Sequence, residues 1–274
     1  MLMLMLTLML MLMLMLMLML MLMLLMLLLM LMLMLMLMLM PPSFKCTNDI
    51  SDASLAQLSA LSQLTRLELE ACSVGDEQQQ QQQQRCVPPA TPDLEWLSLA
   101  DTRVSGGLEY LEPLTCLTAL NIDTSLIGNA ALLEVSRLAS LTTLDAFSTR
   151  CHDSGAAAIA TLTKLRRLEL CGGCLGNAGT QRLSALAGLT SLSLAHNPRI
   201  TEFVLPSLLP GLSLLEDLNL SGTGMRSGAV RPLSRVTTLR YLCLLHTPMA
   251  EGSVDALRGQ LPPGCVLMHS YQRQ

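Results

Sequence analysis

The sequence is short of aromatic and charged residues. Aromatic side chains make up 3% of the 274 residues, with one Trp, three Tyr and three Phe, and charged residues make up 14%. A core must therefore be built from aliphatic side chains, above all leucine. The formal net charge is −4, and the densest basic pair is Arg166–Arg167, which Glu169 follows. Because proteins that bind a phosphate backbone usually carry a clustered basic face, we expect no nucleic-acid partner.

The signatures of common catalytic and metal sites are also missing. The chain has no G-x-S-x-G elbow, no phosphate-binding P-loop and no H-E-x-x-H pair. Its nine cysteines are dispersed and odd in number, which does not indicate a disulfide framework and favours a reducing compartment. We therefore predict a protein that is not an enzyme and that has no cofactor and no metal site.

One pair of cysteines, Cys171 and Cys174, has the C-x-x-C spacing of a redox pair or of half a zinc site. No second C-x-x-C and no pair of His residues stands at ligand spacing. The two cysteines also fall within a leucine-rich segment, and we interpret them as small residues near a core. A thiol redox enzyme that uses Cys171 and Cys174 is the least favoured alternative.

Leucine recurs in a fixed pattern along most of the chain. Successive copies begin 23 to 26 residues apart, except for a first interval of 30 residues that contains the polyglutamine run 78–84. Apolar residues at positions 4 and 6 of each copy alternate with polar ones, which predicts a strand with one buried face. The second half of a copy changes to helical spacing, as in Leu183, Leu186 and Leu189. The eight copies are LTRLELEAC (from Leu64), LEWLSLADT (Leu94), LTALNIDTS (Leu117), LTTLDAFST (Leu141), LRRLELCGG (Leu165), LTSLSLAHN (Leu189), LEDLNLSGT (Leu215) and LRYLCLLHT (Leu239).

These copies resemble the unit of the leucine-rich repeat family, L-x-x-L-x-L-x-x-N/C-x-L, over about residues 41–270, and some are similar to GALA-type repeats. The resemblance implies an α/β solenoid, or horseshoe, with a concave parallel sheet and short convex helices. It also implies a ladder of Asn side chains at position 9 that bonds adjacent turns. Only Asn197 keeps that residue, while Thr, Ser and Cys supply part of the bonding elsewhere. Gly173 has no side chain to contribute, so we expect looser turns near it.

Residues 1–40 form a low-complexity Met/Leu tract, which we separate from a leucine-rich repeat domain at 41–274. As a helix the tract would be about 60 Å long, twice the thickness of a bilayer's hydrocarbon core, and it has no basic n-region or cleavage site of a signal peptide. A repeated hexanucleotide encodes Met-Leu alternation, so we interpret the tract as an expanded microsatellite or a gene-model error rather than a working anchor. Membrane association through residues 1–40 requires that they be translated and inserted as a transmembrane or signal-like segment. The repeat domain is expected in the cytoplasm either way.

The start of the repeat domain bears on that interpretation. Phe44 takes the role of Leu194 in our comparison of the units, and Thr47 that of Asn197. This phase predicts a first strand that begins near residue 39, within the tract. The tract would then overwrite the beginning of a repeat.

The predicted binding surface consists of the side chains that point out of the concave sheet. Aromatic and Arg residues on such a face are the usual binding hot spots. The leading hypothesis is a non-enzymatic scaffold that binds a protein partner there, with the partner unidentified. A membrane-anchored receptor-like protein and the substrate-recognition part of a ubiquitin ligase are alternatives, although residues 41–60 are too short for an F-box. The predicted partner-binding residues are Arg66, Glu68, Trp96, Asn121, Asp145, Phe147, Arg167, Glu169, Asp217 and Tyr241.

Overall fold

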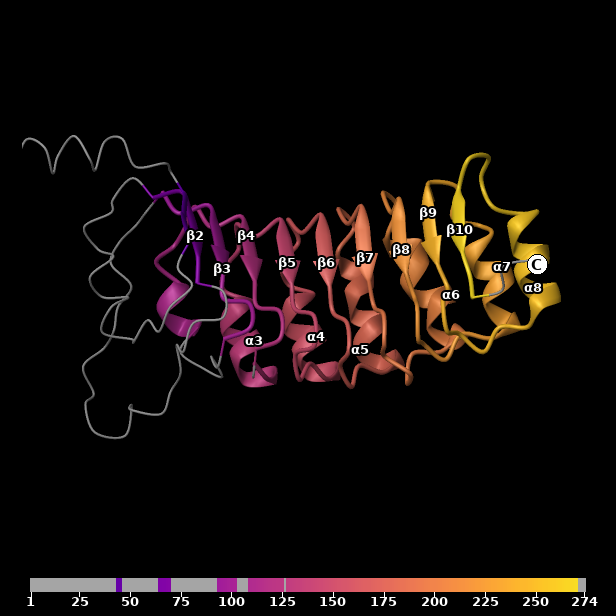
Figure 1. The fold of residues 1–274 in the computed structure, drawn as a ribbon, viewed down its shortest axis with the longest axis horizontal. Coiled ribbons are helices and arrows are strands. Elements are labelled where there is room, and N and C mark those ends of the chain that lie inside the picture. Colours follow the sequence, from indigo (N-terminus) through magenta and orange to yellow (C-terminus); the bar gives the residue numbers. More distant parts are fainter. Residues whose placement is uncertain (1–42, 46–63, 70–92, 103–107, 126, 271–274) are drawn as a thin grey trace, which may run out of the picture. The chain divides into compact units, whose positions relative to one another are not determined.

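Ten parallel strands form a single open sheet in the computed structural model, which describes residues 43–45, 64–69, 93–102, 108–125 and 127–270. Each strand pairs with the next one along the chain (Figure 1). The register places equivalent residues of successive units side by side, so that Leu144 pairs with Leu168 and Leu168 with Leu192. The predicted parallel sheet is confirmed. Its strands are β1 (Ser43–Lys45), β2 (Arg66–Glu68), β3 (Trp96–Ser98), β4 (Ala119–Asn121), β5 (Thr143–Asp145), β6 (Arg167–Glu169), β7 (Ser191–Ser193), β8 (Asp217–Asn219), β9 (Tyr241–Cys243) and β10 (Val266–Met268).

The connecting segments carry short helices along one side of the sheet (Figure 1). The predicted switch to helical spacing is confirmed, because Leu183 and Leu186 are fully buried beside the helix that Leu183 follows. The described helices are α3 (Asn129–Val135), α4 (Asp153–Ile159), α5 (Asn177–Arg182), α6 (Leu205–Leu208), α7 (Val230–Leu233) and α8 (Glu251–Arg258), with 3-10 turns η3 (Leu108–Leu111), η4 (Leu183–Ala185), η5 (Glu202–Val204), η6 (Leu209–Gly211) and η7 (Ser227–Ala229).

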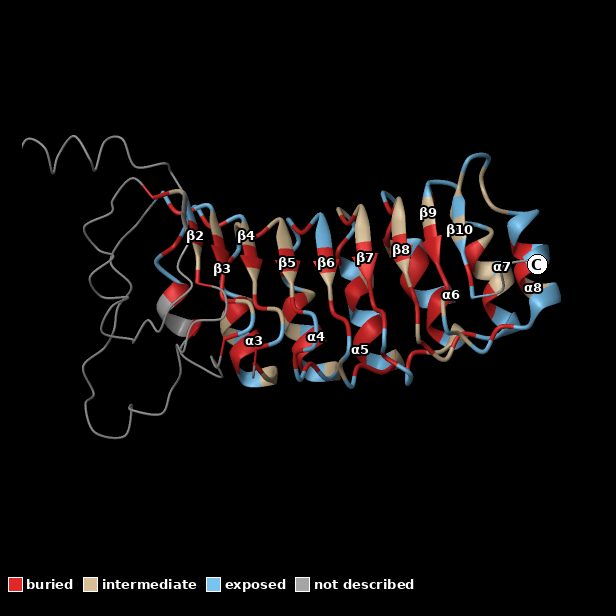
Figure 2. Cartoon of the chain, viewed as in Figure 1, coloured by how far each residue is buried: buried red, intermediate tan, exposed pale blue. Residues whose placement is uncertain are grey.

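The core lies between the strands and these helices (Figure 2). The leucines at positions 1 and 4 of the units fill it, and Leu141, Leu144, Leu165 and Leu168 have no exposed surface. Each buried leucine contributes about 1.5–3 kcal/mol to the hydrophobic stabilisation of the fold. The aliphatic core that the shortage of aromatic residues predicts is therefore present.

Strands β3 to β9 each end in a turn with the same backbone conformation. Position 8 adopts a left-handed conformation, with a φ of 58° at His196 and 56° at His246. These two exposed histidines thus occupy equivalent turns two units apart, and their shared position follows from the repeat. The other residues at this position with a positive φ are Asp101, Thr124, Ser148, Gly172 and Gly222.

The polar groups at position 9 act differently from the expected ladder. The hydroxyl of Thr149 donates to the carbonyl oxygen of Ala146 at 2.9 Å, within its own unit, and the hydroxyls of Thr102, Ser125, Thr223 and Thr247 donate to equivalent carbonyls. These bonds close each turn on itself and do not join it to its neighbour.

Asn197 does bond the adjacent turn. Its Nδ2 donates to the carbonyl oxygen of Leu170 at 2.7 Å, and its Oδ1 accepts the N–H of Leu175 at 3.2 Å. Both partners belong to the unit that contains Gly173. A Cβ atom at Gly173 would lie 3.3 Å from the Asn197 Oδ1, so the glycine leaves the space that the amide uses. The following unit therefore bonds the turn at Gly173 through Asn197, although Gly173 itself has no side chain to contribute.

A second ladder joins the units where their helices begin. The Oδ1 atoms of Asn129 and Asp153 accept the backbone N–H groups of His152 and Gly176 at 2.9 and 2.8 Å, and the Oδ1 of Asn177 accepts that of Thr201 at 2.9 Å. Each acceptor is the first residue of its helix. Each donor is the residue directly before the helix or 3-10 turn of the next unit. Side chains at the helix starts therefore provide the bonding between turns that position 9 mostly lacks.

Glycine makes room for this second ladder. A Cβ atom at Gly179 would lie 2.6 Å from the Cα of Asp153 and 2.7 Å from its Oδ1. A Cβ atom at Gly155 would lie 2.6 Å from the Oδ1 of Asn129. Both glycines are the third residue of their helices. In the Asp-Ser-Gly and Asn-Ala-Gly sequences, the first residue therefore supplies the ladder side chain of its own unit, and the glycine leaves space for the ladder side chain of the preceding unit.

The register of β1 corrects the expected phase of the first unit. Phe44 pairs with Leu67, and Ser43 pairs with Arg66. Phe44 therefore stands at position 4 and not at the position of Leu194, and the strand lies at 43–45 rather than beginning near residue 39. Our alignment relied on the polar residues that follow Phe44, whereas strand pairing depends on the backbone. The predicted overlap between the tract and this strand is wrong.

The Met/Leu tract at 1–40 and the polyglutamine run at 78–84 lie outside the described residues, and so does Thr47. Among the described residues, no helix combines the length and the apolar character that crossing a membrane requires.

Replacing Gly179 by Ala should destabilise the protein by about 1–3 kcal/mol, because the added methyl group collides with the backbone of the neighbouring unit. Helix propensity alone would favour Ala by up to about 1 kcal/mol. Gly252→Ala is the matched control, since nothing lies within 4 Å of a Cβ at that position of α8, and it should stabilise. Urea unfolding of both variants measures the difference. Equal effects would contradict the close approach of the two turns.

Candidate protein-binding surface

The outer side of the sheet presents two residues of every strand. In β2 to β9 the middle residue is buried, and the residues before and after it, at positions 3 and 5 of the unit, point away from the core. We call the residues at positions 3, 5 and 7 of these units the sheet face. All ten predicted binding residues belong to it, so the structure brings them to one side of the molecule.

The predicted residues at the first units form a small cluster. The Nε and Nη2 atoms of Arg66 lie 3.0 and 2.9 Å from the Oε1 of Glu68. The Arg66 guanidinium also lies over the ring of Trp96, 3.6 Å from its centroid, because these two residues are partners in the register of β2 and β3. Trp96 is consequently half-buried beneath an arginine that a carboxylate holds in place.

Carboxylates gather at the middle of the sheet face. Asp145 and Glu169 are register partners on β5 and β6, and Asp123 follows β4. Burial and the charge of Asp145 raise the pKa values of Asp123 and Glu169, although the nearby Arg167 partly offsets the shift at Glu169. Burial likewise raises the pKa of Asp145. The ionised cluster is therefore less favourable in the folded chain than the same groups would be in water.

Several position-5 residues have a local structural role that the sequence interpretation missed. The Oδ1 atoms of Asn121, Asp145 and Asn219 accept the backbone N–H two residues later, at 2.9, 3.1 and 3.0 Å. These bonds turn the chain away from the strand, which is a common use of Asn and Asp. The recurrence of Asn or Asp at position 5 of the unit was the signal in the sequence for this role. Asn121 and Asp145 therefore end their strands in addition to facing outward.

The other predicted residues lie to either side of the carboxylates. Phe147 is exposed, with 38% of its surface accessible, and it directly follows β5 and Ala146. Asp217 and Tyr241 are register partners on β8 and β9. Burial, Cys243 and the charge of Asp217 raise the pKa of Tyr241. The predicted residues thus divide into one group at β2 and β3, one at β4 to β6, and one at β8 and β9.

The short side chains of the sheet face are covered by their neighbours. Ser98, Ser193 and Cys243 are buried although they occupy the outward position 5, and so are Cys171 and Ala195 at position 7. The sheet-face positions of the β7 unit therefore carry only short side chains, those of Ser191, Ser193 and Ala195.

The cysteine pair lacks the features of a reactive thiol site. Cys171 is buried, and its Sγ lies 3.0 Å from the hydroxyl oxygen of Ser193. Burial raises the pKa of Cys171, and it raises that of the neighbouring Cys151 to about 12, whereas a nucleophilic cysteine needs a lowered pKa. Cys174 is exposed. In the part of the chain that the structure describes, no group of three or more His, Cys, Asp or Glu residues is placed to hold a metal ion.

One exposed aromatic residue was missed by the sequence interpretation. Phe203, in η5 on the helix side, has 80% of its surface accessible. The search for binding residues followed the strand positions and so passed over this segment.

Comparison with solved structures identifies the fold as that of leucine-rich repeat proteins. An internalin from Listeria monocytogenes has a TM-score of 0.57 and 18% identity, over 85% of this chain and 74% of that one. A leucine-rich repeat protein from Leptospira interrogans has a TM-score of 0.58 and 18% identity, over 77% and 56%. The ectodomain of the Arabidopsis receptor kinase HAESA, in complex with a peptide hormone, has a TM-score of 0.53 and 17% identity, over 75% and 33%.

The comparisons establish the fold alone. The present chain spans about a third of the HAESA ectodomain and somewhat over half of the Leptospira protein. No protein-family model matches the chain, and no curated protein sequence does. The predicted solenoid with its parallel sheet is confirmed at the level of the fold.

Replacing Asp145 by Asn should stabilise the protein near neutral pH by up to about 1 kcal/mol, since the site is partly solvated. The folded carboxyl has the higher pKa, so it keeps its proton at pH values where the unfolded one has lost it, and stability falls as pH rises through that window. The gain should therefore disappear below about pH 4. Thermal unfolding between pH 3 and pH 8, with the exposed Glu95→Gln as the control, measures it. A gain that does not depend on pH would contradict the assigned cause.

Pulsed alkylation should label the exposed Cys116 and Cys174 at least about tenfold faster than Cys151 and Cys171, because burial and the raised pKa values suppress the thiolate. Mass spectrometry of the separated peptides measures each rate. Fast labelling of Cys171, or a disulfide between Cys171 and Cys174, would restore the thiol-enzyme alternative.

Proposed function

We propose that this chain is a non-enzymatic scaffold that binds a protein partner on its sheet face. The fold of its structural neighbours supports an interaction scaffold in general. The observation that carries the proposal is that the ten predicted residues all occupy outward positions of one sheet. The described helices lie along one side of that sheet (Figure 1).

The chemistry of the sheet face supports this proposal. Trp96 beneath Arg66, the exposed Phe147 and Tyr241 provide aromatic surface, and partly desolvated carboxylates lie between them. Aromatic and Arg residues dominate the energetics of known interfaces. A partner that contacts the middle of the face would meet the side chains of both Asp145 and Phe147.

Structural neighbours supply a precedent for binding of this kind. The HAESA ectodomain structure contains a bound peptide hormone, which is a statement about that protein. For the present chain the equivalent ligand is proposed to be a segment of a protein partner. The receptor-like and ubiquitin-ligase alternatives gain no support from a particular residue or contact. The first depends on residues 1–40, which the structure does not describe.

Charge reversal and truncation at the middle of the sheet face should abolish partner binding. The experiment captures proteins with the full-length chain from a lysate of the cells that express it, and compares the chain with its Asp145→Lys and Phe147→Ala variants. We expect a protein captured by the unaltered chain to be lost, at least about tenfold, with either variant.

Matched changes on the helix side serve as controls. Glu251→Lys makes the same type of charge change on α8, and Leu133→Ala removes an apolar side chain that is 55% exposed on α3. Both should retain the captured protein. Capture that persists in the sheet-face variants would contradict the proposal, provided that thermal unfolding shows every variant to be folded.

A further inference from the structure

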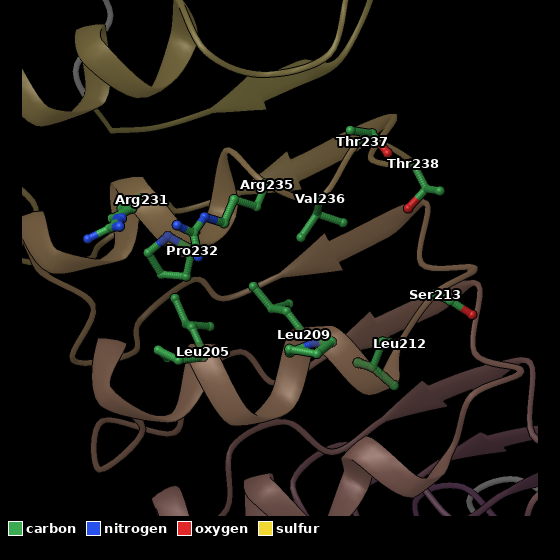
Figure 3. Close-up of a pocket in the computed structure, with 12 residues that line it drawn as sticks. Leu205, Leu209, Leu212, Ser213, Arg231, Pro232, Arg235, Val236, Thr237 and Thr238 are labelled. Atoms are coloured by element: carbon green, nitrogen blue, oxygen red, sulfur yellow. The ribbon is translucent and has the colours of Figure 1, made fainter.

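A groove opens on the helix side of the molecule, away from the sheet face. It has a volume of about 530 Å³ and lies between the segment α6–η6 and the segment that begins with α7. Leu205, Leu209 and Leu212 line it from the first segment and Val236 from the second (Figure 3). Three prolines also contribute to the lining, which makes the walls stiff and largely apolar. Small-molecule and side-chain pockets commonly have about 300–1,000 Å³, so the groove can hold one or two large apolar side chains.

Two arginines stand at this apolar surface. Arg231 lies on α7 and Arg235 lies two residues after that helix ends, and both line the groove (Figure 3). Both are exposed, and no carboxylate among the described residues forms an ion pair with either. Their guanidinium groups are therefore available to a ligand, and the planar fork of donors suits a carboxylate.

The surrounding sequence has a local excess of positive charge. The stretch between Asp217 and Glu251 contains four arginines and no acidic residue, in a chain whose net charge is −4. One of the four, Arg240, pairs with Glu216 at 3.1 Å, and two of the other three are Arg231 and Arg235 at the groove. The charge of the groove therefore complements an acidic ligand and opposes a basic one.

Exposed apolar side chains adjoin the groove in the sequence. Phe203, which is 80% exposed, lies in η5 immediately before α6, and Leu214, which is 49% exposed, follows the lining residue Ser213. Exposed large apolar residues are common at interaction sites. Both residues therefore flank, in the sequence, the segments that line the groove.

We propose that this groove binds a peptide segment in which a large apolar side chain stands next to Asp or Glu. The apolar side chain enters the hollow between α6–η6 and Val236, and the neighbouring carboxylate accepts hydrogen bonds from Arg231 and Arg235. The lining leucines are 0%, 7% and 1% exposed, so they form the packed floor of the groove, and the three prolines and Val236 present the apolar surface that a ligand can reach. A recess receives a side chain, whereas insertion into a bilayer needs apolar groups that project, which favours a peptide over a membrane.

The proposal is tested by selecting random peptides displayed on phage against the immobilised full-length chain. We expect the selected peptides to contain Asp or Glu beside Leu, Ile, Phe or Trp. A synthetic copy labelled with fluorescein should bind in solution, as measured by fluorescence anisotropy. The double variant Arg231→Gln/Arg235→Gln should weaken it by about tenfold or more. Arg182→Gln, which removes an exposed arginine of α5, is the matched control and should bind normally.

Three results would overturn the proposal: the absence of any selected peptide, the selection of peptides without acidic residues, and binding that the double variant does not change. A parallel sedimentation with phosphatidylserine vesicles identifies the competing occupant. Vesicle binding that depends on Arg231 and Arg235, without peptide binding, would assign the groove to a membrane surface. Because the variants leave the sheet face unchanged, a negative result here is separate from a failure of partner capture by that face.

Discussion

Apolar contact between successive turns is the constraint on which the rest of the structure depends. No single unit of about 24 residues can bury its own leucines, so each unit is stable only against its neighbours. Parallel pairing keeps equivalent residues about 4.8 Å apart from one unit to the next. The inward leucines then form the core, and the outward residues necessarily form continuous rows. The sheet face, with its carboxylates and aromatic side chains, is a direct consequence of that stacking.

Hydrogen bonds between the turns lie mainly at the starts of the helices and not at the positions that form the apolar core. Among the described residues, the expected ladder at position 9 persists only at Asn197, since the hydroxyls at this position bond within their own turn. The units are joined instead at the starts of α4, α5 and η5, where Asn129, Asp153 and Asn177 accept backbone N–H groups of the next unit. Gly155 and Gly179 are needed there because neighbouring backbones approach closely. From α3 to η5, the helix side therefore has its own hydrogen bonds between units, although its helices are short.

Periodicity in the sequence was sufficient to predict the strands, the buried leucines and the side of the sheet on which the ten candidate residues lie, because these depend on local alternation. Features that depend on contacts between residues of two different units could not be predicted from local alternation. The second ladder and the helix-side groove each combine residues from different units. The role of Asn121 and Asp145 in ending their strands had a signal, since Asn or Asp recurs at position 5, but that signal was interpreted as surface chemistry. Phe44 was assigned to the wrong position because the alignment weighted polar residues above the strand pattern.

A protein partner is proposed to contact the sheet face. Hydroxyl-radical footprinting of the full-length chain, alone and with its captured partner, tests this claim most directly because it reports the accessibility of individual side chains. We expect the partner to protect Phe147 and Tyr241, together with Trp96, while Leu133 on α3 stays equally accessible. Unchanged modification of Phe147 and Tyr241, with protection confined to the helix side, would contradict it.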